Sequence, residues 1–339
     1  MKPLVSILIP AHNAERWLAD SISSAIAQTW RHKEIIVVDD GSADQTLAVA
    51  QQFESNEVRV VTQPNQGAAV ARNTAFSLAQ GDYIQWLDAD DILDPHKIER
   101  QVLRIKNGLS DRTLLSGAWG YFIYRPSKAQ FIPTLLWHDL SPVEWLTRKM
   151  ANNLHMQTDN WLVSRALTEA AGQWDPRLFR DNDGEYFCRV ILASDGIQFV
   201  PDAKSYYRDV GSKSISHIGR SNKKLDSLLI SLKLHVQYLR SLEDSERTRT
   251  ACLGYLQTWL HHFYPNRPDL IEEAQQLAHT LGGRLTLPRT SWKYLWIEKL
   301  FGFATAKETQ SAYNWVKYSA LRTYDRMMYS LERGRRLPS

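Results

Sequence analysis

The chain has 339 residues, of which 43% are hydrophobic and 23% charged, and its formal net charge is +4 at pH 7. This length suits one large α/β domain with a smaller appendage, and so small a net charge does not indicate a nucleic-acid partner. The two cysteines, Cys188 and Cys252, lie far apart, which argues against a disulfide framework and against a zinc site. No secretory signal opens the sequence and no apolar run approaches the roughly eighteen residues of a membrane span. We therefore expect a cytoplasmic protein, with attachment to the cytoplasmic face of a membrane left open.

Apolar runs and amphipathic segments alternate four times in the first hundred residues, which predicts an open, mostly parallel sheet flanked by helices. The second helix has a capping-box pattern at Ser42 and Gln45, so we expect it to begin at Ser42. The predicted strands are residues 4–9, 34–38, 58–61 and 82–84, and the predicted helices are residues 15–29, 42–53, 68–79 and a segment that begins at Pro95.

Polar segments follow each of these strands, and ligands bind at the carboxyl ends of the strands in sheets of this kind. We therefore expect the four segments to converge. They are residues 10–13, 39–40, 63–67 and 88–91.

The segment after the fourth strand is acidic, because Asp88, Asp90 and Asp91 follow one another within four residues. Such carboxylates repel one another unless a cation or hydrogen bonds compensate them. Mg²⁺ and Mn²⁺ prefer one or two protein carboxylates together with water and phosphate oxygens, which an Asp-x-Asp pair at a strand end can supply. Acids at a helix N-terminus are the alternative, and it applies most readily to Asp91 and Asp94.

The rest of the chain divides into a mixed part and a helical part. Residues 113–137 are β-rich and aromatic, and a polar stretch near residues 212–222 marks the boundary between residues 1–215 and 216–339. Between them we expect helices at 142–150, at 164–171 and from Gly184, and strands at 157–163, 197–200 and 203–207. The helical part should contain helices at 223–242, 246–263, 269–281, 292–301 and 308–333.

The end of the helical part is basic and aromatic. From residue 284 onward there are eleven Lys and Arg but four Asp and Glu. One interpretation is a peripheral membrane face, and the other is an aromatic face that packs on the first domain. The aromatic candidates for this face are Trp292, Tyr294, Trp296, Phe301, Phe303 and Trp315.

Five blocks in this order and spacing resemble glycosyltransferase family 2, whose members are inverting enzymes of the GT-A fold. The blocks are VSILIP at 5–10, VVDDGS at 37–42, the segment 67–73 that ends in Ala71, Arg72 and Asn73, GDYIQWLDADD at 81–91, and DGEYF at 183–187 with Arg189. The resemblance covers roughly residues 1–215 and does not extend to the helical part.

The resemblance implies an enzyme that moves one sugar, with inversion, from a nucleotide-sugar donor, a UDP-sugar by preference, to a hydroxyl group of a glycan or lipid-linked acceptor in surface polysaccharide or glycolipid synthesis. It implies that Asp39, beside Asp40, accepts the N3–H of uracil, and that the backbone of Pro10 and Ala11 lines the base. Asn13 either holds the turn or touches ribose, and Arg72 reaches ribose or diphosphate. For the Asp39 and Asp40 pair a turn and helix cap is the alternative, and for Arg72 it is a solvated helix face.

The resemblance also assigns the metal and the catalytic base. Asp90 would ligate Mn²⁺ or Mg²⁺, with Asp88 on ribose or on the metal's water, and His217 could complete the metal shell. Asp183 would be the base that inversion needs, with Glu185 and Asp181 as alternatives. Trp161 and Trp174 could stack on an acceptor sugar, although core packing is the commoner place for tryptophan.

Two other enzyme classes fit less well. A sugar nucleotidyltransferase and a dinucleotide oxidoreductase both require a glycine-rich phosphate loop after the first strand, and residues 10–13 do not form one. A catalytically silent binding or scaffold protein that acts through its basic tail is the remaining alternative. It gives no reason for four carboxylates, at Asp39, Asp88, Asp90 and Asp183, to be kept at one cleft.

Overall fold

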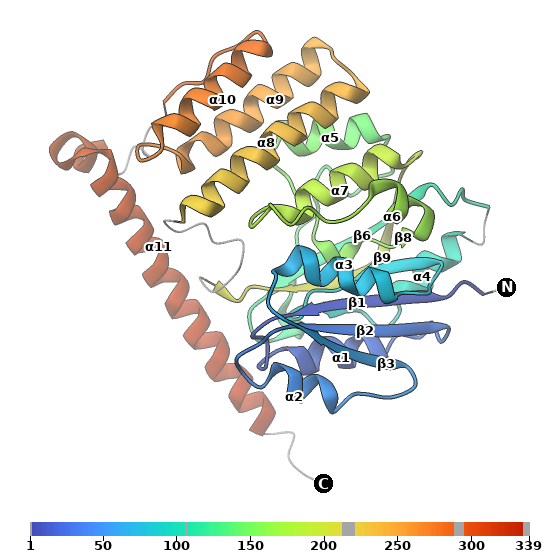
Figure 1. The fold of residues 1–339 in the computed structure, drawn as a ribbon. Helices are drawn as coiled ribbons and strands as arrows, with labels where there is room; N and C mark the ends of the chain where they lie inside the picture. The colour runs from blue at the N-terminus through green and yellow to red at the C-terminus, as the bar shows by residue number, and fades with distance from the viewer. Residues whose placement is uncertain (1, 106–107, 212–220, 288–294, 335–339) are drawn as a thin grey trace.

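The computed structural model describes residues 2–105, 108–211, 221–287 and 295–334. Figure 1 shows a sheet region flanked by helices, a bundle of helices packed on one side of it, and a long C-terminal helix that runs along the outside of the molecule.

The first sheet has five strands in the order β3-β2-β1-β4-β8, all parallel except β8, which pairs antiparallel with β4. Ala11 lies opposite Asp39, and Asp40 lies opposite Gln63, so these strands end at one edge of the sheet. The convergence of the strand ends predicted from the sequence is thereby confirmed for these strands. The strands are β1 (Val5–Ala11), β2 (Lys33–Asp40), β3 (Val58–Gln63), β4 (Tyr83–Trp86) and β8 (Val163–Ser164).

Helices cover both faces of this sheet, and the apolar core is divided into two clusters, one on each face. Ile7 and Ile9 of β1 pack in one cluster with α1, whereas Leu8 packs in the other with α3, because successive side chains of a strand point to opposite faces. Every residue of β1 is buried, as expected of a strand covered on both sides. The helices of this region are α1 (Leu18–Ile26), α2 (Thr46–Gln51), α3 (Ala68–Leu78) and α4 (Lys97–Ile105).

The predicted capping box at the start of α2 is wrong. The helix begins at Thr46, and the hydroxyl of Ser42 instead accepts a hydrogen bond of 3.0 Å from the backbone N–H of Asn13. Asp44 accepts one of 2.9 Å from the N–H of Thr46. Ser42 therefore joins two loops at the strand ends, a role that local sequence does not reveal.

A second sheet has the strand order β5-β9-β6-β7. Its centre is a long parallel pair, β6 and β9, whose register shifts at Gly117. Strand β9 is continuous where two strands were predicted. The strands are β5 (Ile92–Leu93), β6 (Thr113–Phe122), β7 (Gln130–Phe131) and β9 (Gly196–Arg208).

The strand predicted at residues 157–163 is wrong, since the chain there forms a 3₁₀ turn, η2 (Thr158–Asn160), before β8. The carbonyl of Asp159 accepts a hydrogen bond of 2.9 Å from the side-chain amide of Gln85, and the carbonyl of Asn160 accepts one of 3.1 Å from Gln101. Buried amide side chains thus take the place of a strand partner.

The helical part continues the core of the first sheet. Helices α8 and α9 pack against α5, and α8 also packs against α7, so that Tyr186, Leu228 and Leu256 belong to one apolar cluster. The predicted boundary between residues 215 and 216 lies outside the described residues, and the division into two domains stays a prediction. The remaining α-helices before the long C-terminal helix are α5 (Pro142–Ala151), α6 (Arg165–Ala171), α7 (Asn182–Ala193), α8 (Asn222–Leu242), α9 (Glu246–Trp259) and α10 (Pro268–Thr280).

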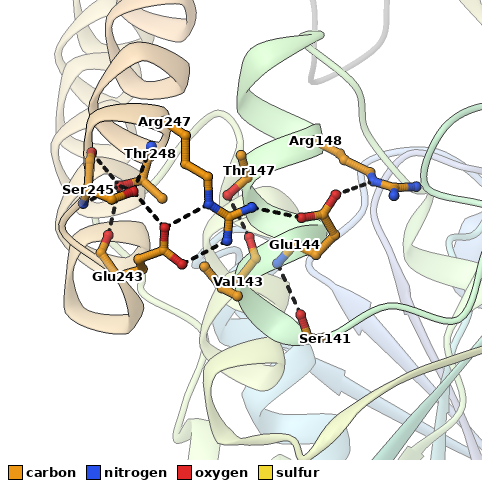
Figure 2. A network of polar contacts seen from close by, with 9 residues as sticks. All are labelled: Ser141, Val143, Glu144, Thr147, Arg148, Glu243, Ser245, Arg247 and Thr248. Atoms are coloured by element: carbon orange, nitrogen blue, oxygen red, sulfur yellow. Dashed lines mark hydrogen bonds and ion pairs between the residues drawn. The ribbon is translucent and has the colours of Figure 1, made fainter.

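A surface network also ties α9 to α5 (Figure 2). The guanidinium of Arg247 pairs with Glu144 of α5 at 3.1 Å and with Glu243 at 2.7 Å. Ser245 and Thr248 form a capping box at the start of α9. The pairs are exposed and contribute little energy, but they show that α9 is held against α5 by polar contacts as well as by the apolar core.

The C-terminal helix, α11 (Leu295–Gly334), is continuous where two helices were predicted. Within the described residues no helix is long and apolar enough to cross a membrane. The guanidinium of Arg125 pairs with Asp325 at 2.7 Å, and Arg322 donates a hydrogen bond of 2.8 Å to the carbonyl of Asp209. The later half of α11 is therefore fastened to the loop after β6 and to the end of β9.

Candidate active site

The acidic turn after β4 is held in place by Arg208, the last residue of β9. The backbone N–H of Arg208 donates to the Asp91 carboxylate at 2.7 Å, and its Nε donates to the carbonyl of Asp90 at 2.8 Å. Asp91 is buried and serves the turn. The helix-start interpretation holds for Asp94 instead, whose carboxylate accepts from the N–H of His96 just before α4.

Asp88 and Asp90 are the two acids of this turn that remain half-buried. Burial and the neighbouring Asp88 carboxylate raise the pKa of Asp90 to about 7. A cation would relieve this repulsion, and carboxylate oxygens suit Mg²⁺ or Mn²⁺, so the pair fits the predicted metal. Among the described residues no group of three or more His, Cys, Asp and Glu could hold a metal, and His217 lies outside the described residues.

Arg72 lies beside this pair on α3 and is buried. Its Nη2 donates to Asp88 at 2.7 Å, and its guanidinium lies 4.3 Å from the centre of the Trp174 ring. Nε and Nη1 of Arg72 are buried without a hydrogen-bond partner in the structure. Unsatisfied guanidinium donors are costly, and charged donors of this kind suit phosphate oxygens.

Asp39 and Asp40 at the end of β2 have different roles. One oxygen of Asp39 accepts from Thr62 Oγ1 at 3.1 Å, while Oδ1 is buried without a hydrogen-bond partner. The oxygens of Asp40 accept from the backbone N–H groups of Gln66 and Gly67 at 2.9 and 2.8 Å. Asp40 therefore holds the loop after β3, which agrees with the turn alternative for this pair, and Asp39 keeps a free acceptor. A role of either carboxylate in nucleotide binding stays a prediction.

The loop after β1 is built by side-chain contacts. Asn13 has a left-handed backbone, with φ of 49°, and its Oδ1 accepts from the N–H of Ala43 at 2.9 Å. Of the two alternatives for Asn13, the structure supports the one in which it holds the turn. Pro10 and Ala11, the last residues of β1, are buried beside Asp39.

The three acids at the start of α7 differ in how far they are engaged. Both oxygens of Glu185 are occupied, by Arg189 at 2.7 and 2.8 Å and by the hydroxyl of Tyr238 at 2.6 Å. Asp181 has a left-handed backbone and lies 3.8 Å from His235. Asp183 is half-buried in the first turn of α7, and no hydrogen bond or ion pair engages its carboxylate within the described residues. Of the three acids, Asp183 is thus the one whose carboxylate is not engaged by another described residue.

Helix α8 supplies residues to this segment that the sequence interpretation missed. Ser227 Oγ accepts from the N–H groups of Phe179 and Arg180 at 2.9 and 3.1 Å, and His235 and Tyr238 contact Asp181 and Glu185 as described above. The only available signal was a polar row, Ser227, His235 and Tyr238, at helical spacing on an otherwise apolar face.

Of the two alternatives for Trp161 and Trp174, acceptor stacking and core packing, the structure supports core packing. Both side chains are at most 1% exposed. Trp174 stacks on Tyr186 with ring centres 4.0 Å apart, and Trp161 stacks on Phe187 at 5.2 Å. The ring faces are therefore used by the core, because the aromatic residues of α7 compete for them.

Comparisons with known proteins agree with this arrangement. Residues 6–153 match the family described as Glycosyl transferase family 2. The chain is 43% identical over 104 residues to the putative teichuronic acid biosynthesis glycosyltransferase TuaG of Bacillus subtilis, a match that covers 30% of this chain and 41% of TuaG. It is 41% identical over 109 residues to the Escherichia coli UDP-Glc:alpha-D-GlcNAc-diphosphoundecaprenol beta-1,3-glucosyltransferase WfgD, which covers 32% and 43% of the two chains. The chain thus spans less than half the length of these relatives.

Solved structures extend the similarity to the fold as a whole. The Staphylococcus aureus TarS 1–349 complex with UDP-GlcNAc has a TM-score of 0.63 and 17% identity, and the match covers 82% of each chain. The complex of the same protein with UDP has a TM-score of 0.59 and 18% identity, over 82% of this chain and 78% of TarS. The expected α/β fold with a helical C-terminal region is confirmed.

Proposed function

We propose that the whole chain transfers a single sugar, with inversion, from a nucleotide-sugar donor to a hydroxyl acceptor, because residues 6–153 match the family described as Glycosyl transferase family 2. The observation that carries the proposal is the proximity of the acidic turn to α7. Arg72 pairs with Asp88 and lies against Trp174, which in turn stacks on Tyr186 of α7. The segments that we propose for the donor and the base are thus linked through this series of contacts.

The donor would be a uridine diphosphate sugar. Asp39 Oδ1 is a buried acceptor without a partner, and the N3–H of a uracil ring would supply the missing donor. The N–H groups on Nε and Nη1 of Arg72, which have no partner in the structure, would bind the diphosphate. A UDP-sugar donor also agrees with the name of WfgD and with the UDP-GlcNAc in the TarS complex.

A divalent cation, Mn²⁺ or Mg²⁺, would be held by Asp90 with help from Asp88. When bound, it would neutralise the charge that develops on the departing nucleoside diphosphate. The turn that presents these carboxylates is already held in place, because Arg208 donates one hydrogen bond to it from its backbone N–H and one from its side-chain Nε.

Asp183 would act as the base. The acceptor oxygen forms a bond to the anomeric carbon while the bond from that carbon to the diphosphate oxygen breaks on the opposite side, which inverts the configuration. The proton of the acceptor hydroxyl goes to the Asp183 carboxylate, and the nucleoside diphosphate leaves.

The acceptor would be a glycan or lipid-linked glycan of surface polysaccharide synthesis, as the names of TuaG and WfgD suggest for those relatives. The enzyme would then work in the cytoplasm, with peripheral contact to the cytoplasmic face of the membrane through its C-terminal helices. A silent scaffold would leave Asp39 Oδ1 and two donors of Arg72 buried without purpose.

Thermal unfolding with UDP, with and without Mn²⁺, tests the donor and the metal together. A ligand at a hundred times its Kd adds about 2.7 kcal/mol of apparent stability, so we expect a clear shift that requires the metal. Asp183→Asn should retain this shift but lose donor hydrolysis and transfer, whereas Asp202→Asn, at an exposed position in β9, should retain both. Unchanged turnover in Asp183→Asn would refute the base, and no shift with any nucleoside diphosphate would favour the scaffold.

A further inference from the structure

The outward face of α11 carries a row of exposed apolar side chains. They recur every three or four residues, so they lie on one side of the helix. At a rise of about 1.5 Å per residue, the row is about 27 Å long. We call it the α11 stripe; it consists of Tyr313, Val316, Ala320, Tyr324, Met327 and Leu331, and every member is exposed.

The opposite side of the same helix segment is docked, which fixes the direction of the stripe. Asp325 accepts a hydrogen bond of 2.7 Å from the Arg125 side chain and one of 2.9 Å from the backbone N–H of Tyr124. The Arg125 side chain is 10% exposed. Tyr329 packs on Tyr124 with ring centres 6.1 Å apart. Rotation of α11 about its axis would break these contacts, so the stripe remains turned outward.

The acids of this segment are paired, whereas two of its cations are not paired with any described residue. Its acids, Asp325 and Glu332, both pair with Arg125. Lys317 and Arg326 are exposed, and within the described residues no ion pair holds either of them. On this helix Lys317 lies roughly 60° from the middle of the stripe, and Arg326 lies roughly 120° away on the other flank. The two cations therefore flank the stripe and do not lie within it.

We propose that the α11 stripe, with Lys317 and Arg326, is a docking surface for an anionic lipid membrane. An amphipathic helix of this kind lies in the membrane plane with its apolar side in the headgroup boundary, and cations near the surface add an attraction to anionic lipids. The inference deepens the proposed function, on whose lipid-linked acceptor it rests. A second copy of the chain is a poorer occupant, because two such surfaces would bring like charges together without a carboxylate to pair with them.

The docked side of α11 lies close to the donor site, so attachment would orient the site at the membrane. Tyr124 contacts the ring of Trp17 at 5.7 Å, and the guanidinium of Arg208, which holds the acidic turn, lies 4.2 Å from Trp17. The later half of α11 is therefore packed near the proposed donor site.

The stripe differs from the aromatic face predicted from the sequence. Of the six predicted residues, Phe301 is exposed in α11. The other five, Trp292, Tyr294, Trp296, Phe303 and Trp315, lie outside the side chains that the structure describes.

Flotation of the full chain with phosphatidylcholine vesicles, with and without about one third phosphatidylglycerol, tests the proposal. We expect binding to the anionic vesicles only, and a steep loss of binding as salt is added. Lys317→Gln with Arg326→Gln should weaken binding about 30-fold, at about fivefold for each cation. Tyr324→Ser, Met327→Ser and Leu331→Ser together should abolish it.

The matched control is Leu103→Ser, Ile132→Ser and Leu135→Ser, three similarly exposed apolar residues away from α11, which should bind as the unaltered chain does. Unchanged vesicle binding in the stripe variant, or none by the unaltered chain, would overturn the inference. So would a dimer that dissociates in the stripe variant without vesicle binding. The metal-dependent shift with UDP is measured in parallel, so a failure of the docking surface can be told apart from a failure of the proposed function.

Discussion

The hydroxyl of Tyr238 donates a hydrogen bond of 2.6 Å to Oε1 of Glu185, and this contact joins α8 of the helical region to the helix that begins with the proposed base. Glu185 is buried and also pairs with Arg189. Tyr238→Phe removes a hydrogen bond to a charged group, which is worth about 1.5–3 kcal/mol. We expect kcat to fall about tenfold, while the Kd for UDP is unchanged, because α7 and not the donor pocket is released.

The control for this variant is Tyr121→Phe, which removes an exposed hydrogen bond of 2.7 Å to Gln130 between β6 and β7. Steady-state kinetics and UDP titration should show no change there. A loss of UDP binding in Tyr238→Phe equal to its loss of kcat would mean that the contact supports the fold in general and does not position α7.

His235 should make stability depend on pH. Burial and the nearby Lys149 of α5 hold the pKa of His235 well below its ordinary value, and the other groups that face it are Tyr255 of α9 and Asp181. Below pH 6.5 the unfolded chain binds a proton that the folded chain does not. The stability contribution is therefore lost as the pH falls, by at most about 1.4 kcal/mol per pH unit.

Urea unfolding at pH 7.5 and pH 5 measures this effect by comparison with His235→Gln, since other groups titrate in both proteins. The unaltered chain should lose more stability than the variant over this range. Parallel pH profiles for the two proteins would contradict the assignment to His235.

The first sheet was predictable because its strands are buried on both faces and therefore appear as uninterrupted apolar runs. The ends of parallel strands meet at one edge, which is why Asp39 and Asp88 could be placed at the same edge of the sheet from the sequence. The sequence wrongly predicted a helix start at Ser42 and a strand at residues 157–163. The observed structure there depends on contacts with distant segments, from the loop at Asn13 and from the buried amide of Gln85.

The positions that could not be predicted depend on contacts between distant segments. Tyr238 is 53 residues from Glu185, and nothing in the pattern of α8 indicates its partner. Trp161 and Trp174 have ring faces that suit a sugar or a core equally well, and only the aromatic residues of α7 decide between them.

Gly41 should be required at the turn after β2. Its φ is 63°, and a Cβ there would lie 2.6 Å from the backbone nitrogen of Asn65. Gly41→Ala should therefore cost about 1–3 kcal/mol of stability and should weaken UDP binding by displacing the loop after β3. Gly254→Ala is the control: it lies within α9, where an added Cβ meets nothing within 4 Å, and should add about 0.5–1 kcal/mol. Equal thermal shifts for the two variants would refute the argument.

Asp39 should determine affinity for the base of the nucleotide. Asp39→Asn replaces an ionised acceptor by a neutral amide, and a hydrogen bond to a charged group is worth about 1.5–3 kcal/mol, so the Kd for UDP should rise about 10- to 100-fold with little change in thermal stability. Asp40→Asn is the informative comparison, because its oxygens hold the loop after β3. It should lower the unfolding temperature of the protein without nucleotide, and weaken UDP binding only as far as the loop is released. If Asp39→Asn binds UDP as tightly as the unaltered chain, the base is not read by Asp39.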